Sequence, residues 1–319
     1  MRPQPRTERV VPMAADLRES AASSRSVLVG LIGAGIQASR SPALHEREAE
    51  AQGLRCVYQL VDLDLLGLTA DVVGDLLTSA QRLGFAGLNS THPCKQTVVS
   101  TLDGLSDEAK AIGAVNTVVF ADGRRTGHNT DAYGFAESFR RGLPDVRLER
   151  VVQVGAGGAG AAVAHALLSL GAGTVTLVDL DAGRADALAD QLRRRFGRGR
   201  AGVARDPASA VAAADGLVNA TPVGMARYPG LPIAEALLNP GLWVADIVYT
   251  PLETELLSTA RRLGCRTLAG GGMAVFQAVE AFRLFTGIVP DAARMLRHFE
   301  SMCAAGATPI VDQPIRKGG

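Results

Sequence analysis

A glycine-rich turn between an apolar run of strand length and an alanine-rich helical segment constrains the fold of this chain most strongly. The turn reads Gly155-Ala156-Gly157-Gly158-Ala159-Gly160 and fits the pattern G-x-G-x-x-G. It follows a predicted strand over 151–154 and opens a predicted helix to Leu170, and another strand is predicted over 174–178. Glycines at these positions let a pyrophosphate approach the unpaired N–H groups of the helix N-terminus. The segment therefore predicts a strand–helix–strand unit that binds a dinucleotide, and close helix–sheet packing alone is the alternative.

An acidic residue at the end of the next strand indicates which dinucleotide is bound. Asp179 lies where a carboxylate accepts hydrogen bonds from the adenine ribose hydroxyls of NAD. Because a carboxylate repels the 2′-phosphate of NADP, Asp179 predicts NAD rather than NADP. Arg184 has two interpretations: it reaches the adenosine or a phosphate, or it is a solvated helix residue beside Asp181 and Asp186.

Strand-length apolar runs alternate with helix-length amphipathic runs over most of the chain. This pattern is typical of an α/β fold with mostly parallel sheets, and 319 residues exceed what one core usually reaches, so we expect two units. In the first unit, strands are predicted over 27–32, 57–63, 85–89 and 115–120, with helices after Ser41-Pro42 and over 71–83. The pair Asp122-Gly123 predicts an antiparallel hairpin. In the second unit, further strands are predicted over 216–219, 243–248 and 265–268, with helices over 131–143, 233–238 and, last, 273–285.

Composition excludes several classes of protein. With 33 basic residues, 32 acidic residues and a net charge of +1, the chain lacks the basic face of a nucleic-acid binder, and its dense arginine cluster is expected to be solvated: Arg193, Arg194, Arg195, Arg198 and Arg200. Four dispersed cysteines fit neither a zinc site nor a disulfide scaffold, which indicates a reducing, cytoplasmic compartment, and the five histidines show no metal-ligand spacing. Residues 1–25 contain no apolar run typical of a signal or membrane anchor. We expect a disordered leader there and a disordered tail over 311–319.

Several polar segments lie where predicted strands end. Ser39 and Ser41 flank an arginine just before a helix, where hydroxyls either cap the helix or bind a carboxylate. Lys95 follows a strand whose carboxyl end is the usual ligand edge of an open α/β sheet. Asn116 and Asp131 add an amide and a carboxylate near the junction of the two units, and each also has a turn or helix-cap explanation.

Taken in order, eight segments resemble one family. The chain is similar to the shikimate and quinate/shikimate dehydrogenases over about residues 27–288, through the segments SRSPALH, NSTHPCK, GAVNT, GHNTD, GAGGAG, NATPVGM, DIVYTP and GGGMAVFQ. The resemblance implies a substrate-binding domain over 26–130 plus 270–310, a Rossmann-type dinucleotide domain over 131–269, and an active site in the cleft between them. It also implies reversible hydride transfer between a ring secondary alcohol of shikimate or quinate, or its dehydro form, and nicotinamide.

The resemblance assigns roles to individual residues. Lys95 would be the acid/base, with Asp131 as its orienting partner. The substrate would contact Ser39, Ser41, Thr91, Lys95, Asn116, Asp131, Tyr249 and Gln277. The dinucleotide would contact the turn from Gly155 to Gly160, Asp179, Arg184, Thr221, Val223, Met225, Ile247 and Gly270.

Two branches of the family remain to be distinguished. NADP-dependent members carry an Asn-Arg-Thr-like sequence where this chain has Asp179-Leu180-Asp181, so the chain is closer to the NAD-dependent quinate/shikimate branch. Ser41 stands where quinate-using members often have threonine, and Ser90 replaces a usual valine or isoleucine, which leaves the preferred ring acid open. The alternatives are a biosynthetic NADP-dependent shikimate dehydrogenase, an enzyme for an amino-substituted ring acid, and a non-catalytic dinucleotide sensor. We expect a monomer or a homodimer.

Overall fold

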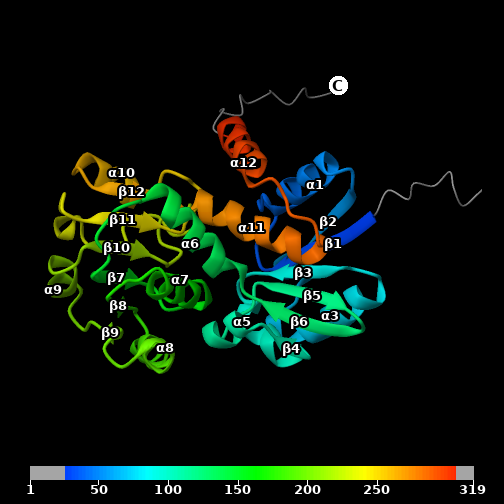
Figure 1. The fold of residues 1–319 in the computed structure, drawn as a ribbon, viewed down its shortest axis with the longest axis horizontal. Helices are drawn as coiled ribbons and strands as arrows, with labels where there is room; N and C mark the ends of the chain where they lie inside the picture. The colour runs from blue at the N-terminus through cyan, green and yellow to red at the C-terminus, as the bar shows by residue number, and fades with distance from the viewer. Residues whose placement is uncertain (1–25, 307–319) are drawn as a thin grey trace, which may run out of the picture.

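The computed structural model describes residues 26–306, and the leader 1–25 and the tail 311–319 that we expected to be disordered lie outside these residues. Two six-stranded sheets, each with helices packed against it, form two halves of the molecule that lie next to each other (Figure 1). The strand order is β2-β1-β3-β5-β6-β4 in the first sheet and β12-β11-β10-β7-β8-β9 in the second.

The first sheet mixes parallel and antiparallel strands. Its strands are β1 (Ser26–Gly33), β2 (Arg55–Asp62), β3 (Gly87–Ser90), β4 (Gly104–Leu105), β5 (Thr117–Ala121) and β6 (Arg124–His128). Strands β2, β1 and β3 are parallel, whereas β5 is antiparallel to both β3 and β6. At the predicted hairpin, Asp122 has φ 52° and Gly123 has φ 73°, as a tight two-residue hairpin turn requires. The helices of this half are α1 (Ser41–Ala51), α2 (Leu63–Leu66), η1 (Ala70–Val72), α3 (Val73–Arg82), α4 (Cys94–Thr97), η2 (Val98–Thr101) and α5 (Asp107–Ile112).

The second sheet is entirely parallel. Its strands are β7 (Arg150–Val154), β8 (Thr174–Val178), β9 (Ala201–Val203), β10 (Gly216–Asn219), β11 (Trp243–Asp246) and β12 (Arg266–Leu268). The strand order reverses between β7 and β10, which is the arrangement of a Rossmann fold, and ligands bind at the carboxyl ends of the strands flanking such a point. The helices of this half are α7 (Gly158–Ser169), α8 (Ala182–Phe196), α9 (Pro207–Ala212), η3 (Glu235–Leu237) and α10 (Glu255–Arg262).

Two helices join the halves. The chain passes from the first sheet to the second along α6 (Thr130–Gly142) and returns along α11 (Gly271–Thr286), and these helices lie side by side (Figure 1). Their backbones touch, because a Cβ added to Gly134 would lie 2.7 Å from the backbone N of Gln277 and 2.7 Å from the carbonyl oxygen of Met273. The predicted domain boundaries at 130 and 270 fall at these two helices and stay predictions.

Three sequence-based expectations were wrong in detail. The helix over 273–285 is not the last, since α12 (Ala292–Gly306) follows it and buries Met295 and Phe299 against α11 and α1. The helix predicted over 233–238 is the single 3-10 turn η3. Arg200 is not merely solvated, because its Nε and a terminal nitrogen donate to the carbonyls of Gly173 and Ala172 at 2.9 and 2.7 Å.

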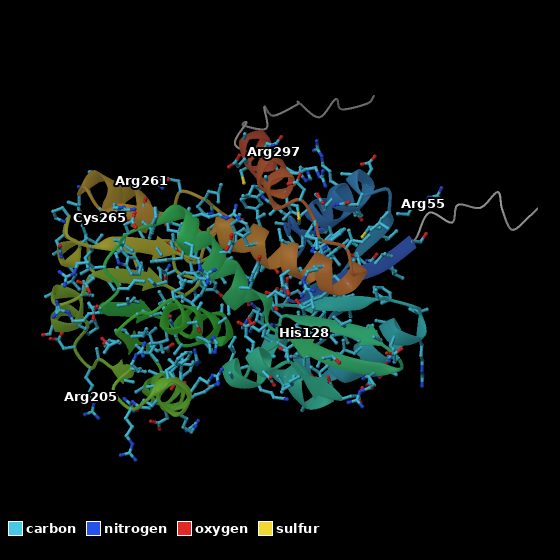
Figure 2. The ribbon with its side chains drawn as sticks, viewed as in Figure 1. Arg55, His128, Arg205, Arg261, Cys265 and Arg297 are labelled. Atoms are coloured by element: carbon cyan, nitrogen blue, oxygen red, sulfur yellow. The ribbon has the colours of Figure 1, made fainter. Side chains whose placement is uncertain are left out.

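Two further findings concern the cysteines and the helices of the described part. All four cysteines are free thiols, and Cys265 at the outer end of the second half lies far from His128 near the junction (Figure 2).

Between residues 26 and 306, no helix has both the length and the apolar character that a membrane span needs.

Candidate active site

A lysine and an aspartate from different elements meet at the junction of the halves. Lys95 lies on α4, the short helix after β3, and Asp131 lies in the first turn of α6. The Lys95 Nζ donates to Asp131 Oδ2 in an ion pair, and the two side chains are 17% and 8% exposed. The structure therefore brings the expected catalytic pair together and leaves part of the lysine side chain accessible.

Asn116 contacts the other oxygen of the Asp131 carboxylate. Its Nδ2 donates to Asp131 Oδ1 at 2.9 Å and to Thr130 Oγ1 at 2.9 Å, while its Oδ1 accepts from the Thr130 N–H at 2.7 Å. The N-cap of α6 is Asn129, whose Oδ1 accepts from the Asp131 N–H at 3.1 Å. Capping therefore does not explain Asp131, whose carboxylate contacts Lys95 and Asn116 instead.

The two serines lie where the turn after β1 meets α1, and we call residues 39–41 the serine turn: Ser39 lies in the turn and Ser41 is the first residue of α1. No side chain caps α1, whose N-cap position is Arg40, and Ser39 Oγ accepts from the Ser41 N–H at 3.3 Å. The Arg40 guanidinium lies 5.6 Å from the centroid of the Phe299 ring, and the Tyr249 ring lies 6.5 Å from the same centroid. Tyr249, from the loop after β11 in the second half, is thus brought close to the serine turn of the first half.

Tyr249 is also close enough to Asp131 to interact with it electrostatically. Over the whole residue Tyr249 is 37% exposed, yet desolvation and, second, the Asp131 carboxylate raise the pKa of its phenol. The hydroxyl therefore stays protonated and can donate a hydrogen bond to a carboxylate ligand.

Among the described residues, Thr91 and Gln277, the other two expected to contact the substrate, make no hydrogen bond to the Lys95–Asp131 pair. Thr91 packs against the end of β1, where a Cβ on Gly33 would come within 2.3 Å of Thr91 Cγ2. The Gln277 side chain is not joined to the catalytic pair, because its Nε2 donates to the Ala274 carbonyl at 2.9 Å within α11. Its backbone nevertheless touches α6 at Gly134, one turn after Asp131.

The glycine-rich turn has the geometry of a phosphate-binding loop. Gly155 has φ +102°, and a Cβ on Gly160 would lie 2.4 Å from the Gly155 carbonyl oxygen, so glycine is needed at both positions. No side chain caps α7, and no atom lies within 4 Å of a Cβ added to its N-cap residue Gly157. The first N–H groups of α7 therefore have no side-chain cap, and the space beside the Gly157 Cα is open, which fits the pyrophosphate of a dinucleotide.

The Asp179 carboxylate is fixed beside this turn. Its Oδ2 accepts from the Ala156 N–H at 2.7 Å and its Oδ1 from the Asp181 N–H at 2.9 Å. A guanidinium nitrogen of the half-exposed Arg184 lies 3.8 Å from Asp179 Oδ1 and another lies 3.6 Å from Asp181 Oδ2. Both interpretations of Arg184 thus remain. Its exposure fits a solvated helix residue, and its position beside Asp179 fits a contact with the adenosine or a phosphate.

The residues expected near the nicotinamide occupy three neighbouring segments. A Cβ on Gly155 would lie 2.9 Å from Thr221 Cγ2, and a Cβ on Gly270 would lie 2.4 Å from the Ile247 carbonyl oxygen. Val223 and Met225 pair in an isolated bridge within the loop after β10. The loops after β10 and β11 and the start of α11 thus surround the carboxyl ends of the central strands.

The residues expected to contact the substrate and those expected to contact the dinucleotide are adjacent across the junction of the two halves. A Cβ on Gly158, in the glycine-rich turn, would lie 3.5 Å from Lys95 Cβ. A dinucleotide bound on the turn would therefore lie next to the lysine. An alcohol placed between them can lose its hydroxyl proton to an amine while its carbon gives up a hydride.

Sequence reasoning missed three buried polar residues that hold the glycine-rich turn and the loops after β10 and β11. Asn219 and Asp246 are buried at the ends of β10 and β11, and buried Gln153 donates from Nε2 to the carbonyls of Gly155 and Gly160 at 2.8 and 2.9 Å. The available signal was a polar residue inside or at the end of an otherwise apolar strand run.

Comparisons with known proteins agree with this geometry. The family model described as the shikimate dehydrogenase substrate binding domain matches residues 31–118, and the one described as the shikimate 5′-dehydrogenase C-terminal domain matches residues 270–298. A shikimate dehydrogenase (NADP(+)) from Streptomyces avermitilis is 64% identical over 284 residues, which cover 88% of this chain and 98% of the relative. A quinate/shikimate dehydrogenase (NAD(+)) from Corynebacterium efficiens is 51% identical over 280 residues, covering 87% and 99%.

A solved structure shows the same fold. Quinate dehydrogenase from Corynebacterium glutamicum in complex with NAD matches with a TM-score of 0.81 and 50% identity, over 87% of this chain and 99% of that one. The resemblance indicated by the eight segments is confirmed, as is the two-part α/β fold with a Rossmann-type half. The chain belongs to the shikimate/quinate dehydrogenase family of oxidoreductases that use a nicotinamide dinucleotide.

Proposed function

We propose that this enzyme is an NAD-dependent quinate/shikimate dehydrogenase. The observation that carries the proposal is the contact between Lys95 and Asp131 beside a glycine-rich turn, with the serine turn and Tyr249 close by. The two serine hydroxyls and the tyrosine hydroxyl suit the carboxylate of a ring acid. The amide of Asn116 and the Lys95–Asp131 pair suit its hydroxyl groups.

The division of labour within the site follows from its chemistry. A dinucleotide held on the turn from Gly155 to Gly160 would supply the hydride acceptor for oxidation and the hydride donor for reduction. In the ion pair with Asp131, Lys95 Nζ is an ammonium, which is the form that donates a proton to the ketone oxygen during reduction. For oxidation the ammonium must first release a proton to solvent, and the neutral amine then takes the hydroxyl proton of the ring alcohol. Asp131, held by Asn116 at 2.9 Å, orients both Lys95 and the substrate hydroxyl. Thr91 and Gln277 complete the contacts to the ring; one N–H of the Gln277 amide is bound to the Ala274 carbonyl, and its second N–H and its oxygen can serve the ring hydroxyls.

Asp179 supports NAD as the cofactor. Its carboxylate is held by two backbone N–H groups at the end of β8, which leaves lone pairs on both oxygens for the ribose hydroxyls. A 2′-phosphate at the same place would meet a fixed negative charge. The quinate dehydrogenase of Corynebacterium glutamicum, 50% identical, was solved in complex with NAD.

A biosynthetic NADP-dependent shikimate dehydrogenase is the second candidate. It is favoured by the relative from Streptomyces avermitilis, which is 64% identical and carries NADP(+) in its name. In that case Arg184 would leave Asp179 and Asp181 to contact the 2′-phosphate.

The test is a set of initial rates at fixed pH for quinate and shikimate, each with NAD and with NADP, followed by the absorbance of the reduced nicotinamide. We expect turnover with NAD, and the quinate-to-shikimate ratio then gives the preferred ring acid. Turnover with NADP alone would replace the proposal by the second candidate. Absence of turnover in all four assays would contradict both and favour a modified ring acid or a dinucleotide sensor.

A further inference from the structure

A buried carboxylate without an assigned role lies at the carboxyl ends of β10 and β11. Asp246 is 2% exposed, and Asn219 on the neighbouring strand is its register partner. The Asp246 Oδ1 accepts from Asn219 Nδ2 at 3.0 Å and from the Val248 N–H at 2.9 Å, and its Oδ2 accepts from Thr254 Oγ1 at 2.8 Å. Three uncharged donors thus hold a carboxylate in the interior, and burial raises its pKa to about 6.

The Asn219 amide extends this network into the loop after β10. Its Nδ2 also donates to the Val223 carbonyl at 2.9 Å, and its Oδ1 accepts from the Thr221 N–H at 3.1 Å and from Thr221 Oγ1 at 2.6 Å. Thr221 Oγ1 in turn accepts from the Val223 N–H at 3.1 Å. The amide therefore uses both its donors and both its acceptor positions, and it fixes which atoms of the loop face the glycine-rich turn.

The other two bonds of Asp246 fix the loop after β11 at both ends. Val248, whose N–H is bound, separates Ile247 from Tyr249, so the bond sets the direction in which the chain leaves the strand. Thr254 closes the loop, and its Oγ1 also accepts from the Leu257 N–H at 3.3 Å as the N-cap of α10. The carboxylate contacts the loop after β11 directly and the loop after β10 through Asn219. A shift of either loop therefore breaks a buried hydrogen bond to Asp246 or to the amide bound to it, which is costly.

We propose that Asp246 is a positioning residue for hydride transfer, which holds the loop of Thr221 and Val223 and the loop of Ile247 and Tyr249 in one fixed relation. This inference rests on the proposed function, because that function gives Val223 and Ile247 to the nicotinamide and Tyr249 to the ring acid. Asp246 touches neither ligand and acts through the two loops. A single substitution there should therefore weaken cofactor and ring-acid binding together.

The test compares Asp246→Asn with a matched control, Asp215→Asn. Asp215 is also a buried carboxylate of the second sheet, but it lies just before β10, where its Oδ2 accepts from the Arg150 N–H at 2.8 Å. For each variant we would measure the melting temperature, the Kd for NADH and NADPH by calorimetry, and kcat and KM for the ring acid. We expect Asp246→Asn to raise both Kd and KM and to lower kcat/KM by about 10- to 100-fold, which is what small misplacements of reacting groups cost. Asp215→Asn should lower the melting temperature alone.

A second pair of variants keeps the test decisive if Asp246→Asn does not fold. Thr254→Val removes the donor to Asp246 Oδ2, whereas Thr254→Ser retains it, so only the valine variant should shift Kd and KM. The inference is overturned if Asp246→Asn, or Thr254→Val in its place, lowers the melting temperature but leaves Kd and KM at wild-type values. Dinucleotide binding needs no ring acid, so it tests the loops even where the wild type turns over neither quinate nor shikimate.

Discussion

Removing the charge of Asp179 should change which dinucleotide the enzyme uses. In Asp179→Asn the side chain keeps its size, but it can no longer accept on both sides from the Ala156 and Asp181 N–H groups, which lie 2.7 and 2.9 Å away. The negative charge beside the adenosine position disappears. Use of NADP should rise and use of NAD should fall.

The magnitude follows from the geometry. A carboxylate and one phosphate charge about 4 Å apart repel each other by about 1 kcal/mol in water and about 4 kcal/mol at the effective dielectric of a protein surface. Relief of that repulsion should raise kcat/KM with NADP by about 5- to 900-fold. With NAD, loss of hydrogen bonds to a charged acceptor should cost about 1.5–3 kcal/mol, or about 10- to 160-fold.

The assay is kcat/KM with each dinucleotide at a saturating concentration of the ring acid. Asp181→Asn is the matched control, because it removes an equal charge two residues away while asparagine still caps α8. This control should leave the ratio of NAD to NADP use within about threefold. If Asp179→Asn also leaves the ratio within about threefold, Asp179 does not select the cofactor and the electrostatic reasoning is wrong.

Three other substitutions have defined outcomes. Lys95→Ala should lower kcat by about 100-fold or more with little change in ring-acid affinity, and a loss of turnover below about tenfold would show that Lys95 does not carry the proton. Gly216→Ala should lower the free energy of unfolding by about 1–3 kcal/mol in denaturant titrations, because its Cβ would lie 1.9 Å from the Trp243 ring, and unchanged stability would contradict this contact. His45 Nε2 is buried without a partner, and burial lowers the pKa of His45 from 6.5 to about 3. As the pH falls below 6.5, His45 is protonated in the unfolded chain but not in the folded one, so the folded state loses stability between pH 6.5 and 3. His45→Phe should abolish this pH dependence. Unfolding curves measured across that pH range would detect the difference.

Local patterns predicted most of the strands and the turn types. The strands over 174–178 and 216–219 have the predicted bounds, because their apolar runs end sharply at turn residues. The Asp122-Gly123 hairpin formed because both residues tolerate positive φ. The eight segments in sequence order then identified the family, which no single segment could do.

Features that depend on distant contacts could not be predicted in this way. Helix α12 became evident only when Met295 and Phe299 packed on α11 and α1. The run over 233–238 has helical spacing, yet Pro240 follows closely and only one 3-10 turn forms. The roles of Asn219 and Asp246 depend on the pairing of two strands that lie far apart in the sequence.

The backbone contact between α6 and α11 limits how the two halves can move relative to each other. Gly134 touches the backbone at Met273 and Gln277, and a Cβ on Gly272 would lie 2.3 Å from Ser138 Oγ, so the helices meet backbone to backbone at one level and through a single small side chain at another. Sliding one helix along the other would force these atoms to collide, whereas a small rotation about their shared line of contact would not. Admission and release of a ring acid would then require one half to rotate about the helix pair. That rotation would change the distance between Lys95 and the glycine-rich turn.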